Sequence, residues 1–186
     1  MNRSLRAPPA AAAVARRRAV VPERLPGTAP SPEQIASVIP APVHELCRRL
    51  RAAGKRAWVV GGSVRDLLRG RPVADYDVCT DALPKEVQRI FPRVIPTGIE
   101  HGTVTVLADG HPVEVTTLRR DVSTDGRRAT VAFSMDWAED AARRDFTINA
   151  LYADPLTGAV FDYFGGLDDL AARRVRFIGD PRDRIV

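Results

Sequence analysis

The pattern of apolar positions along the chain predicts several short helices. Ser31-Pro32-Glu33 is typical of a helix start, because serine caps the first turn and proline is accepted there. A second helix is expected from about Pro42 to Ala53, and Gly54 ends it. Its apolar residues recur at helical spacing: Val43, Leu46, Cys47 and Leu50. Further helices are expected over residues 63–69, 83–91, 136–143, 144–152 and 167–172.

Short apolar or alternating runs between these helices predict strands. They cover residues 56–60, 76–79, 103–107, 113–117, 160–163 and 175–178. The third and fourth runs flank Asp109-Gly110, a dipeptide typical of a β-hairpin turn. The polar stretch 119–130 is expected to be a mobile loop. Strands mixed with helices, including an antiparallel hairpin, indicate an α+β or mixed α/β fold.

Composition adds a boundary near residue 30. The chain has 186 residues and a net charge of +5, and residues 1–24 alone hold six arginines and one glutamate, which is the whole excess. Residues 1–30, rich in alanine, proline and arginine, are expected to be a disordered tail, with a mitochondrial transit peptide or a misassigned start codon as the alternatives. No apolar run approaches the ~18 residues of a membrane span, and two buried, reduced cysteines fit a cytoplasmic protein.

A glycine turn joins an expected strand to an expected helix. Such a turn presents free backbone N–H groups, and the helix dipole adds a preference for phosphate. We therefore expect Gly61, Gly62 and Ser63 to bind nucleotide phosphates, with Arg65 reaching the same groups through its bidentate guanidinium. Asp66 is interpreted as structural, either as a helix cap or as the partner of a neighbouring arginine.

Two carboxylates, Asp75 and Asp77, stand one residue apart on an expected strand. Side chains alternate faces along a strand, so both carboxylates should share one face. Two acids on one face repel each other, and a bound divalent cation removes that repulsion. A solvated turn is the alternative. We expect Asp75 and Asp77 to bind Mg²⁺ together with a polyphosphate substrate.

Three further polar residues are candidates for the same site. Glu114 is flanked by Val113 and Val115, so it points away from the apolar face of its own strand. If that strand neighbours the aspartate strand, Glu114 is a third carboxylate near the metal; otherwise it is solvated. Asp145 and Asn149 are four apart on an expected helix and share a face, which predicts either a polar stripe toward the site or surface salt bridges.

Four motifs occur in a fixed order along the chain: Gly61–Leu68, Asp75-Tyr76-Asp77, Glu114–Thr117 and Arg143–Ala150. Over roughly residues 45–186 they resemble the head domain of the bacterial-type (class II) CCA-adding enzyme and poly(A) polymerase family, in the polymerase-β nucleotidyltransferase superfamily. His101-Gly102-Thr103-Val104 resembles the CCA-adding branch more than the poly(A) branch. The resemblance implies a short mixed sheet with helices packed against it.

The resemblance also implies an activity, the Mg²⁺-dependent transfer of nucleotides from CTP and ATP to the 3′ end of tRNA. It assigns triphosphate binding to Gly62 and Arg65, metal binding to Asp75 and Asp77, a nucleotide contact to Arg144 and the third carboxylate position to Glu114. Transfer would be an in-line attack of the RNA 3′-hydroxyl on the α-phosphate.

Members of the family continue past this region into a base-reading helix and into neck, body and tail domains. We therefore expect residues 31–186 to be a head domain and the chain to be an N-terminal fragment. Two alternatives stay open. One is a poly(A) polymerase of the same family, which would need only ATP, and the other is a truncated, non-catalytic product that binds nucleotide or RNA weakly.

Overall fold

The computed structural model describes residues 30–125 and 128–183. Residues 1–29, which make up nearly all of the expected tail, lie outside the described residues, and so does the transit-peptide alternative for them. The strands are β1 (Ala57–Val60), β2 (Asp77–Thr80), β3 (Val94–Gly98), β4 (Thr103–Ala108), β5 (His111–Thr117), β6 (Arg119–Asp125), β7 (Arg128–Phe133), β8 (Leu151–Ala153) and β9 (Val160–Asp162). The helices are α2 (Pro32–Val38), α3 (Ala41–Ala52), α4 (Gly62–Leu68), α5 (Pro84–Ile90), α6 (Trp137–Ala142) and α7 (Gly166–Ala171), and 3₁₀ turns are η1 (Ile99–His101), η2 (Thr147–Asn149) and η3 (Pro181–Asp183).

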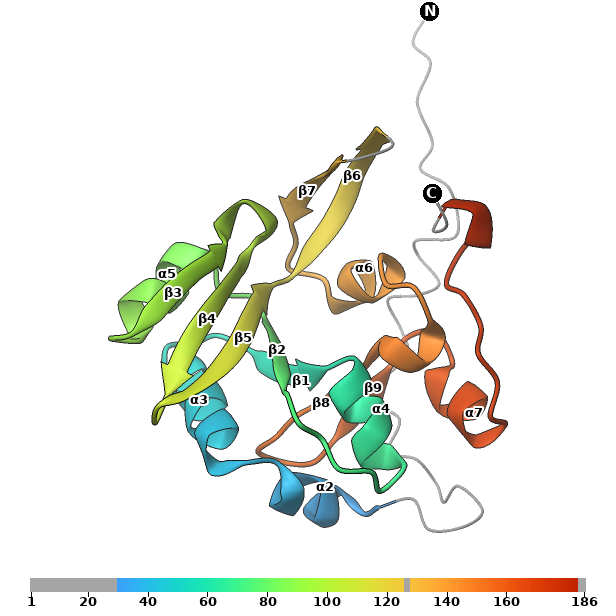
Figure 1. The fold of residues 1–186 in the computed structure, drawn as a ribbon, viewed down its shortest axis with the longest axis horizontal. Coiled ribbons are helices and arrows are strands. Elements are labelled where there is room, and N and C mark those ends of the chain that lie inside the picture. The colour runs from blue at the N-terminus through green and yellow to red at the C-terminus, as the bar shows by residue number, and fades with distance from the viewer. Residues whose placement is uncertain (1–29, 126–127, 184–186) are drawn as a thin grey trace, which may run out of the picture.

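Within the described residues, one mixed sheet has the strand order β3-β4-β5-β2-β1-β8-β9 (Figure 1). Its neighbouring strands are antiparallel except for β2 and β5, which run parallel. The expected α+β class and mixed sheet are therefore confirmed. The β4–β5 hairpin is also confirmed, and its turn has φ of 49° at Asp109 and 81° at Gly110, the left-handed values that a tight hairpin turn requires.

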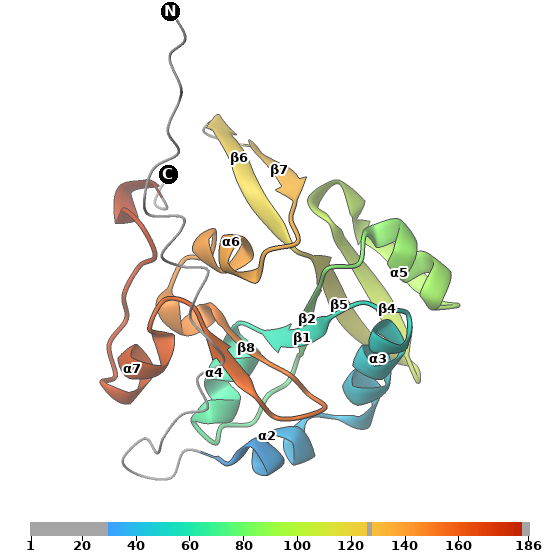
Figure 2. The same cartoon turned by 180° about the vertical axis from the view of Figure 1, so that it is seen from behind.

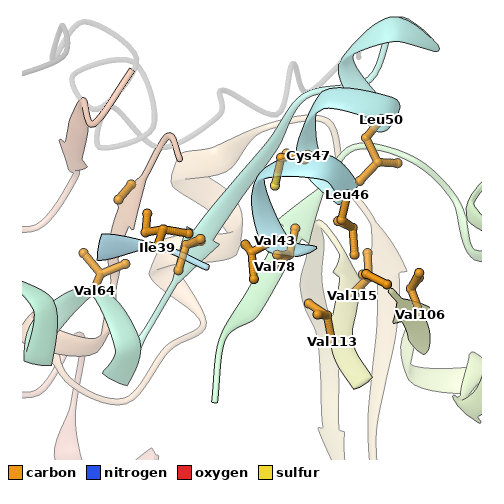
Figure 3. Close-up of a cluster of buried hydrophobic side chains, with 14 of the residues drawn as sticks. Ile39, Val43, Leu46, Cys47, Leu50, Val64, Val78, Val106, Val113 and Val115 are labelled. Atoms are coloured by element: carbon orange, nitrogen blue, oxygen red, sulfur yellow. The ribbon is translucent and has the colours of Figure 1, made fainter. Parts of the chain in front are cut away.

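The main core lies between the sheet and the helices on one of its faces. Figure 2, seen from behind, shows α3 lying over the strands, and Figure 3 shows its side chains meeting those of the sheet. The predicted stripe of α3 is buried in full, against strand residues that are also buried: Val78, Val106, Val113 and Val115. Burial of each large apolar side chain in this way contributes about 1.5–3 kcal/mol to the stability of the folded state. The expected helix start is present as well, since Ser31 and Gln34 form a capping box on α2.

A second, smaller core lies on the other face, under α6. Trp58 and Trp137 have ring centroids 3.9 Å apart, and Trp58 also stacks on Phe161 at 4.0 Å. Both tryptophans therefore belong to the core. Cys47 and Cys79 are free, buried thiols, as expected, one in each core.

The expected mobile loop at 119–130 is wrong. Strands β6 and β7 pair from Arg119↔Phe133 to Asp125↔Arg128, and the connecting residues 126–127 lie outside the described part of the chain. The ribbon they form projects beyond the main sheet (Figure 1). The polar sequence gives no sign of these two strands, because backbone hydrogen bonds between paired strands need no apolar face.

Two expectations near the C-terminal end are also wrong. The stretch 144–152 is not one helix, because it contains only the short turn η2 and then enters β8, where it pairs with β1 and β9. The stretch 175–178 is not a strand, since it makes only a single bridge, Phe146↔Phe177. In both stretches, pairing with residues distant in the sequence determines the local structure.

Candidate active site

The glycine turn sits between β1 and α4, where its backbone conformation is open only to glycine. Gly61 has φ 81° and ψ −140°, and its N–H donates to the carbonyl of Leu151 at 3.2 Å, which ties the turn to β8. A Cβ atom built on Gly61 would lie 3.8 Å from Nη1 of Arg144, so this guanidinium lies beside the turn. Ser63 is buried and its hydroxyl donates to the carbonyl of Val60 at 2.9 Å. Its backbone N–H is therefore the group it can offer to a phosphate.

The side chain of Arg65 extends from α4 and is held in a network of polar side chains. Its Nε and Nη2 donate to the two carboxylate oxygens of Asp66 at 3.0 and 2.9 Å, and its Nη1 donates to Oδ1 of Asn149 at 2.9 Å. Asn149 in turn donates through Nδ2 to Asp145 at 3.2 Å. Asp66 therefore has the structural pairing that was expected, and Asp145 and Asn149 meet near Arg65 although no α-helix carries them.

The carboxylates gather around the first residue of β2. Because β2 begins at Asp77, Asp75 lies in the preceding connection, and the expectation that one strand carries both is wrong. Glu114 is the direct neighbour of Asp77 in the parallel β2–β5 register, so the condition for a third carboxylate is met. Partial burial raises the pKa of Asp77, where Arg144 opposes and Asp75 adds to the rise. Partial burial and the charge of Asp77 likewise raise the pKa of Glu114.

This donor set fits a hard divalent cation bound together with a polyphosphate. In the described ranges no three His, Cys, Asp or Glu side chains are grouped so that they could hold a metal ion by themselves. Mg²⁺ is usually held by one or two carboxylates, with water and substrate phosphates completing its octahedron. Asp75 and Asp77 supply that number of carboxylates, and the repulsion between them would be relieved by the cation.

Beneath Asp77 lies a buried network that the sequence analysis missed. Asp140 has no exposed surface, and it accepts hydrogen bonds from Nε of Arg143 at 2.9 Å, Nη2 of Arg144 at 3.1 Å and the hydroxyl of Tyr152 at 2.8 Å. Burial opposes its ionisation, but the charges of Arg144 and Arg143 outweigh it, so the pKa of Asp140 is lowered. Arg143 and Arg144 follow Asp140 at three and four residues, which is the spacing of helix ion pairs and could have suggested the contact.

Together these residues form one arrangement on the open face of the sheet. Asp77 stands on β2, with the glycine turn of β1–α4 on one side and Glu114 of β5 on the other. Arg144 lies close to both Gly61 and Asp77. Backbone amides, two guanidinium groups and carboxylates for a cation are what a site for a metal–polyphosphate needs.

This fold is that of a nucleotidyltransferase head domain. Residues 57–176 match the model of the poly A polymerase head domain, and the chain belongs to that family. Nucleotidyltransferases of this family normally use a divalent metal ion. Among the helices of residues 30–125 and 128–183, none has both the length and the apolar character of a membrane span.

The relatives point to one branch of the family. The chain is 48% identical over 141 residues to the CCA-adding enzyme of Streptococcus gordonii and 45% identical over 141 residues to that of Bacillus licheniformis. Each alignment covers 75% of this chain and 35% of the relative. The chain therefore spans about a third of the length of the curated relatives it matches.

Solved structures give the same likeness. The chain superposes on the CCA-adding enzyme of Bacillus stearothermophilus in complex with CTP with a TM-score of 0.70 and 39% identity, covering 78% of this chain and 36% of that one. It superposes on a tRNA nucleotidyltransferase complexed with a primer tRNA and an incoming ATP analog with a TM-score of 0.56 and 32% identity, covering 72% of this chain and 39% of that one.

Proposed function

We propose that this chain carries the nucleotidyl-transfer site of a cytoplasmic CCA-adding enzyme, which adds nucleotides from CTP and ATP to the 3′ end of tRNA. Residues 31–186 are its head domain. The observation that carries the proposal is the position of Asp77 between the glycine turn and Glu114, close to Arg144. The relatives named as CCA-adding enzymes, and the neighbour in complex with CTP, support this choice of substrates.

Each part of the site has a task in this transfer. The amides of Gly61, Gly62 and Ser63, with Arg65, bind the triphosphate, and Asp66 and Asn149 keep the Arg65 guanidinium in one orientation. A Mg²⁺ ion bound by Asp75 and Asp77 would neutralise phosphate charge and favour ionisation of the attacking hydroxyl.

The remaining residues act on either side of the reacting phosphorus. Arg144 lies beside Gly61 and offers fixed positive charge to the phosphates near the turn. Glu114, on the opposite side of Asp77, is in place to accept a hydrogen bond from the attacking hydroxyl. Most of the acceleration then comes from positioning and from charge stabilisation, as is usual in phosphoryl transfer.

The first experiment measures nucleotide binding. Wild-type protein, the double variant Asp75→Asn/Asp77→Asn and the control Asp168→Asn, an exposed carboxylate on α7, are titrated with CTP with and without Mg²⁺. We expect Mg²⁺ to strengthen CTP binding in the wild type and the control, and to have no effect in the double variant. A wild type whose CTP affinity ignores Mg²⁺ would contradict the assignment of the metal ligands.

The second experiment identifies the reaction. A tRNA lacking its 3′ end is offered labelled CTP, ATP or both, with the wild type and the same variants. Ordered addition of C, C and A confirms the proposal. Runs of A without C would assign the chain to poly(A) polymerase, and a wild type that adds neither nucleotide to the tRNA would be the non-catalytic remnant.

A further inference from the structure

The sheet face opposite α3 carries a group of threonines next to the carboxylates. On β4 and β5 the buried valines point into the main core, so the residues between them point to the open face. These residues include Glu114 and three partly exposed threonines: Thr103, Thr105 and Thr116. Thr97 of β3 joins them through a contact of 3.1 Å between its Oγ1 and that of Thr105. We call Thr97, Thr103, Thr105 and Thr116 the threonine surface.

Strand register places this surface in line with the active site. Thr105 lies opposite Glu114, which neighbours Asp77, so the three residues form one row across β4, β5 and β2. Thr103 lies opposite Thr116 in the next row, with their Oγ1 atoms 3.1 Å apart. Neighbouring strands are about 4.8 Å apart, so the row extends about 10 Å from Asp77, roughly the size of one nucleotide.

The direction of the reaction assigns an occupant to this surface, and this step rests on the proposed function. In an in-line transfer the attacking and leaving oxygens lie on opposite sides of the phosphorus. The leaving pyrophosphate belongs with the glycine turn and Arg65, on the β1 side of Asp77. The attacking hydroxyl must then approach from the β5 side, over Glu114, and the nucleotide that carries it lies over β5 and β4.

We propose that the threonine surface binds the ribose of the last nucleotide of the acceptor RNA and recognises its 2′-hydroxyl. A hydroxyl group offers one donor and two acceptor positions, so two paired threonines keep both donor and acceptor capacity for a third hydroxyl. The 2′-hydroxyl is itself a donor and an acceptor, and it is the group by which a protein distinguishes RNA from DNA.

The test measures recognition of the sugar. Fluorescence anisotropy measures the affinity for a short RNA ending in cytidine and for the same RNA ending in 2′-deoxycytidine, with Mg²⁺ and a CTP analogue that cannot react. Wild type is expected to prefer the ribose end by about fivefold, the effect of roughly one hydrogen bond. Thr105→Val/Thr116→Val, which keeps the shape and strand preference of threonine, should bind both RNAs equally. Thr105→Ser/Thr116→Ser, which restores the hydroxyls, should recover the preference.

One further variant completes the design. Thr157→Val, on the exposed β8–β9 turn, should change the affinity for neither RNA. A preference that survives in the valine variant, or a wild type that shows no preference or no RNA binding, overturns the proposal. CTP affinity is measured in parallel. If wild type binds CTP with Mg²⁺ and yet shows no sugar preference, or shows one that the valine substitutions leave unchanged, this inference fails and the proposed function stands. If CTP binding also fails, the proposed function has failed.

Discussion

Arg65 and Arg144 both lie beside the glycine turn, but the protein holds them in opposite ways. Arg65 sits at the rim with a partly exposed partner, Asp66, at 29% and 26% side-chain exposure. Arg144 is bound to Asp140, which has no exposed surface at all. Exposed ion pairs contribute about 0–1 kcal/mol to folding, whereas breaking a buried pair costs about 3–5 kcal/mol. The comparison predicts that Arg65 contributes little to folding, whereas Arg144 belongs to a buried pair on which folding depends.

The largest expected effect comes from removing the buried partner. Asp140→Ala leaves Arg143 and Arg144 without the carboxylate that they share, so the free energy of unfolding should fall by about 3–5 kcal/mol. Urea unfolding measures this change. The matched control is Asp66→Asn at the rim, which should change stability by less than about 1 kcal/mol. Equal losses in the two variants would contradict the comparison.

The same carboxylate should give the protein a characteristic response to acid. The pKa of Asp140 is lowered in the folded state, so its stabilising contribution is complete above its unfolded pKa of about 3.9 and is lost as the pH falls through the lower folded value. Urea unfolding at a series of pH values should therefore show a stability gap between wild type and Asp140→Asn. This gap should be constant at neutral pH and narrow below about pH 4. A stability difference between wild type and Asp140→Asn that stays constant into strong acid would contradict a lowered pKa of Asp140 in the folded state.

Lysine substitutions at the two arginines should separate binding from folding. Arg65→Lys keeps the charge but loses the bidentate fork, so CTP affinity should fall by about tenfold with stability unchanged. Arg144→Lys should lower both CTP affinity and the free energy of unfolding, since Arg144 donates to Asp140 and Tyr152. Calorimetric titration and urea unfolding of the two variants give the comparison. A loss of stability in Arg65→Lys but not in Arg144→Lys would contradict the expected difference between the two arginines.

The smallest expected effect concerns the side chain that orients Arg65. Asn149→Ala removes the acceptor of Nη1 but leaves Asp66 in place, so CTP affinity should fall by about two- to threefold, the effect of a weak hydrogen bond. The same titration detects the change. A loss well above tenfold would mean that Asn149 binds the nucleotide itself.

What could be read from the sequence were the features that a few neighbouring residues determine. The glycine turn, the β4–β5 hairpin and the α3 stripe depend on local chemistry and spacing. The position of Glu114 beside Asp77 depends on the parallel pairing of β2 with β5, whose residues are far apart in the chain, so it could only be stated as a condition.

The errors have the same physical origin. Tyr152 is drawn into β8 by pairing with Val60, which overrides the helical pattern of the preceding residues, and that pairing places its hydroxyl on Asp140. The β6–β7 ribbon was missed because each strand completes the hydrogen bonds of the other without an apolar face. Long-range partners, rather than local preference, built both features.

The burial of both cysteines makes the chain convenient for site-specific labelling. Burial raises the pKa of Cys47 and of Cys79 to about 12, and thiol reagents attack the thiolate. At neutral pH the folded protein should therefore behave toward a maleimide as though it contained no cysteine. A Val122→Cys substitution on β6, where the native side chain is 58% exposed, would then take up a fluorophore at a single known position without removal of either native thiol.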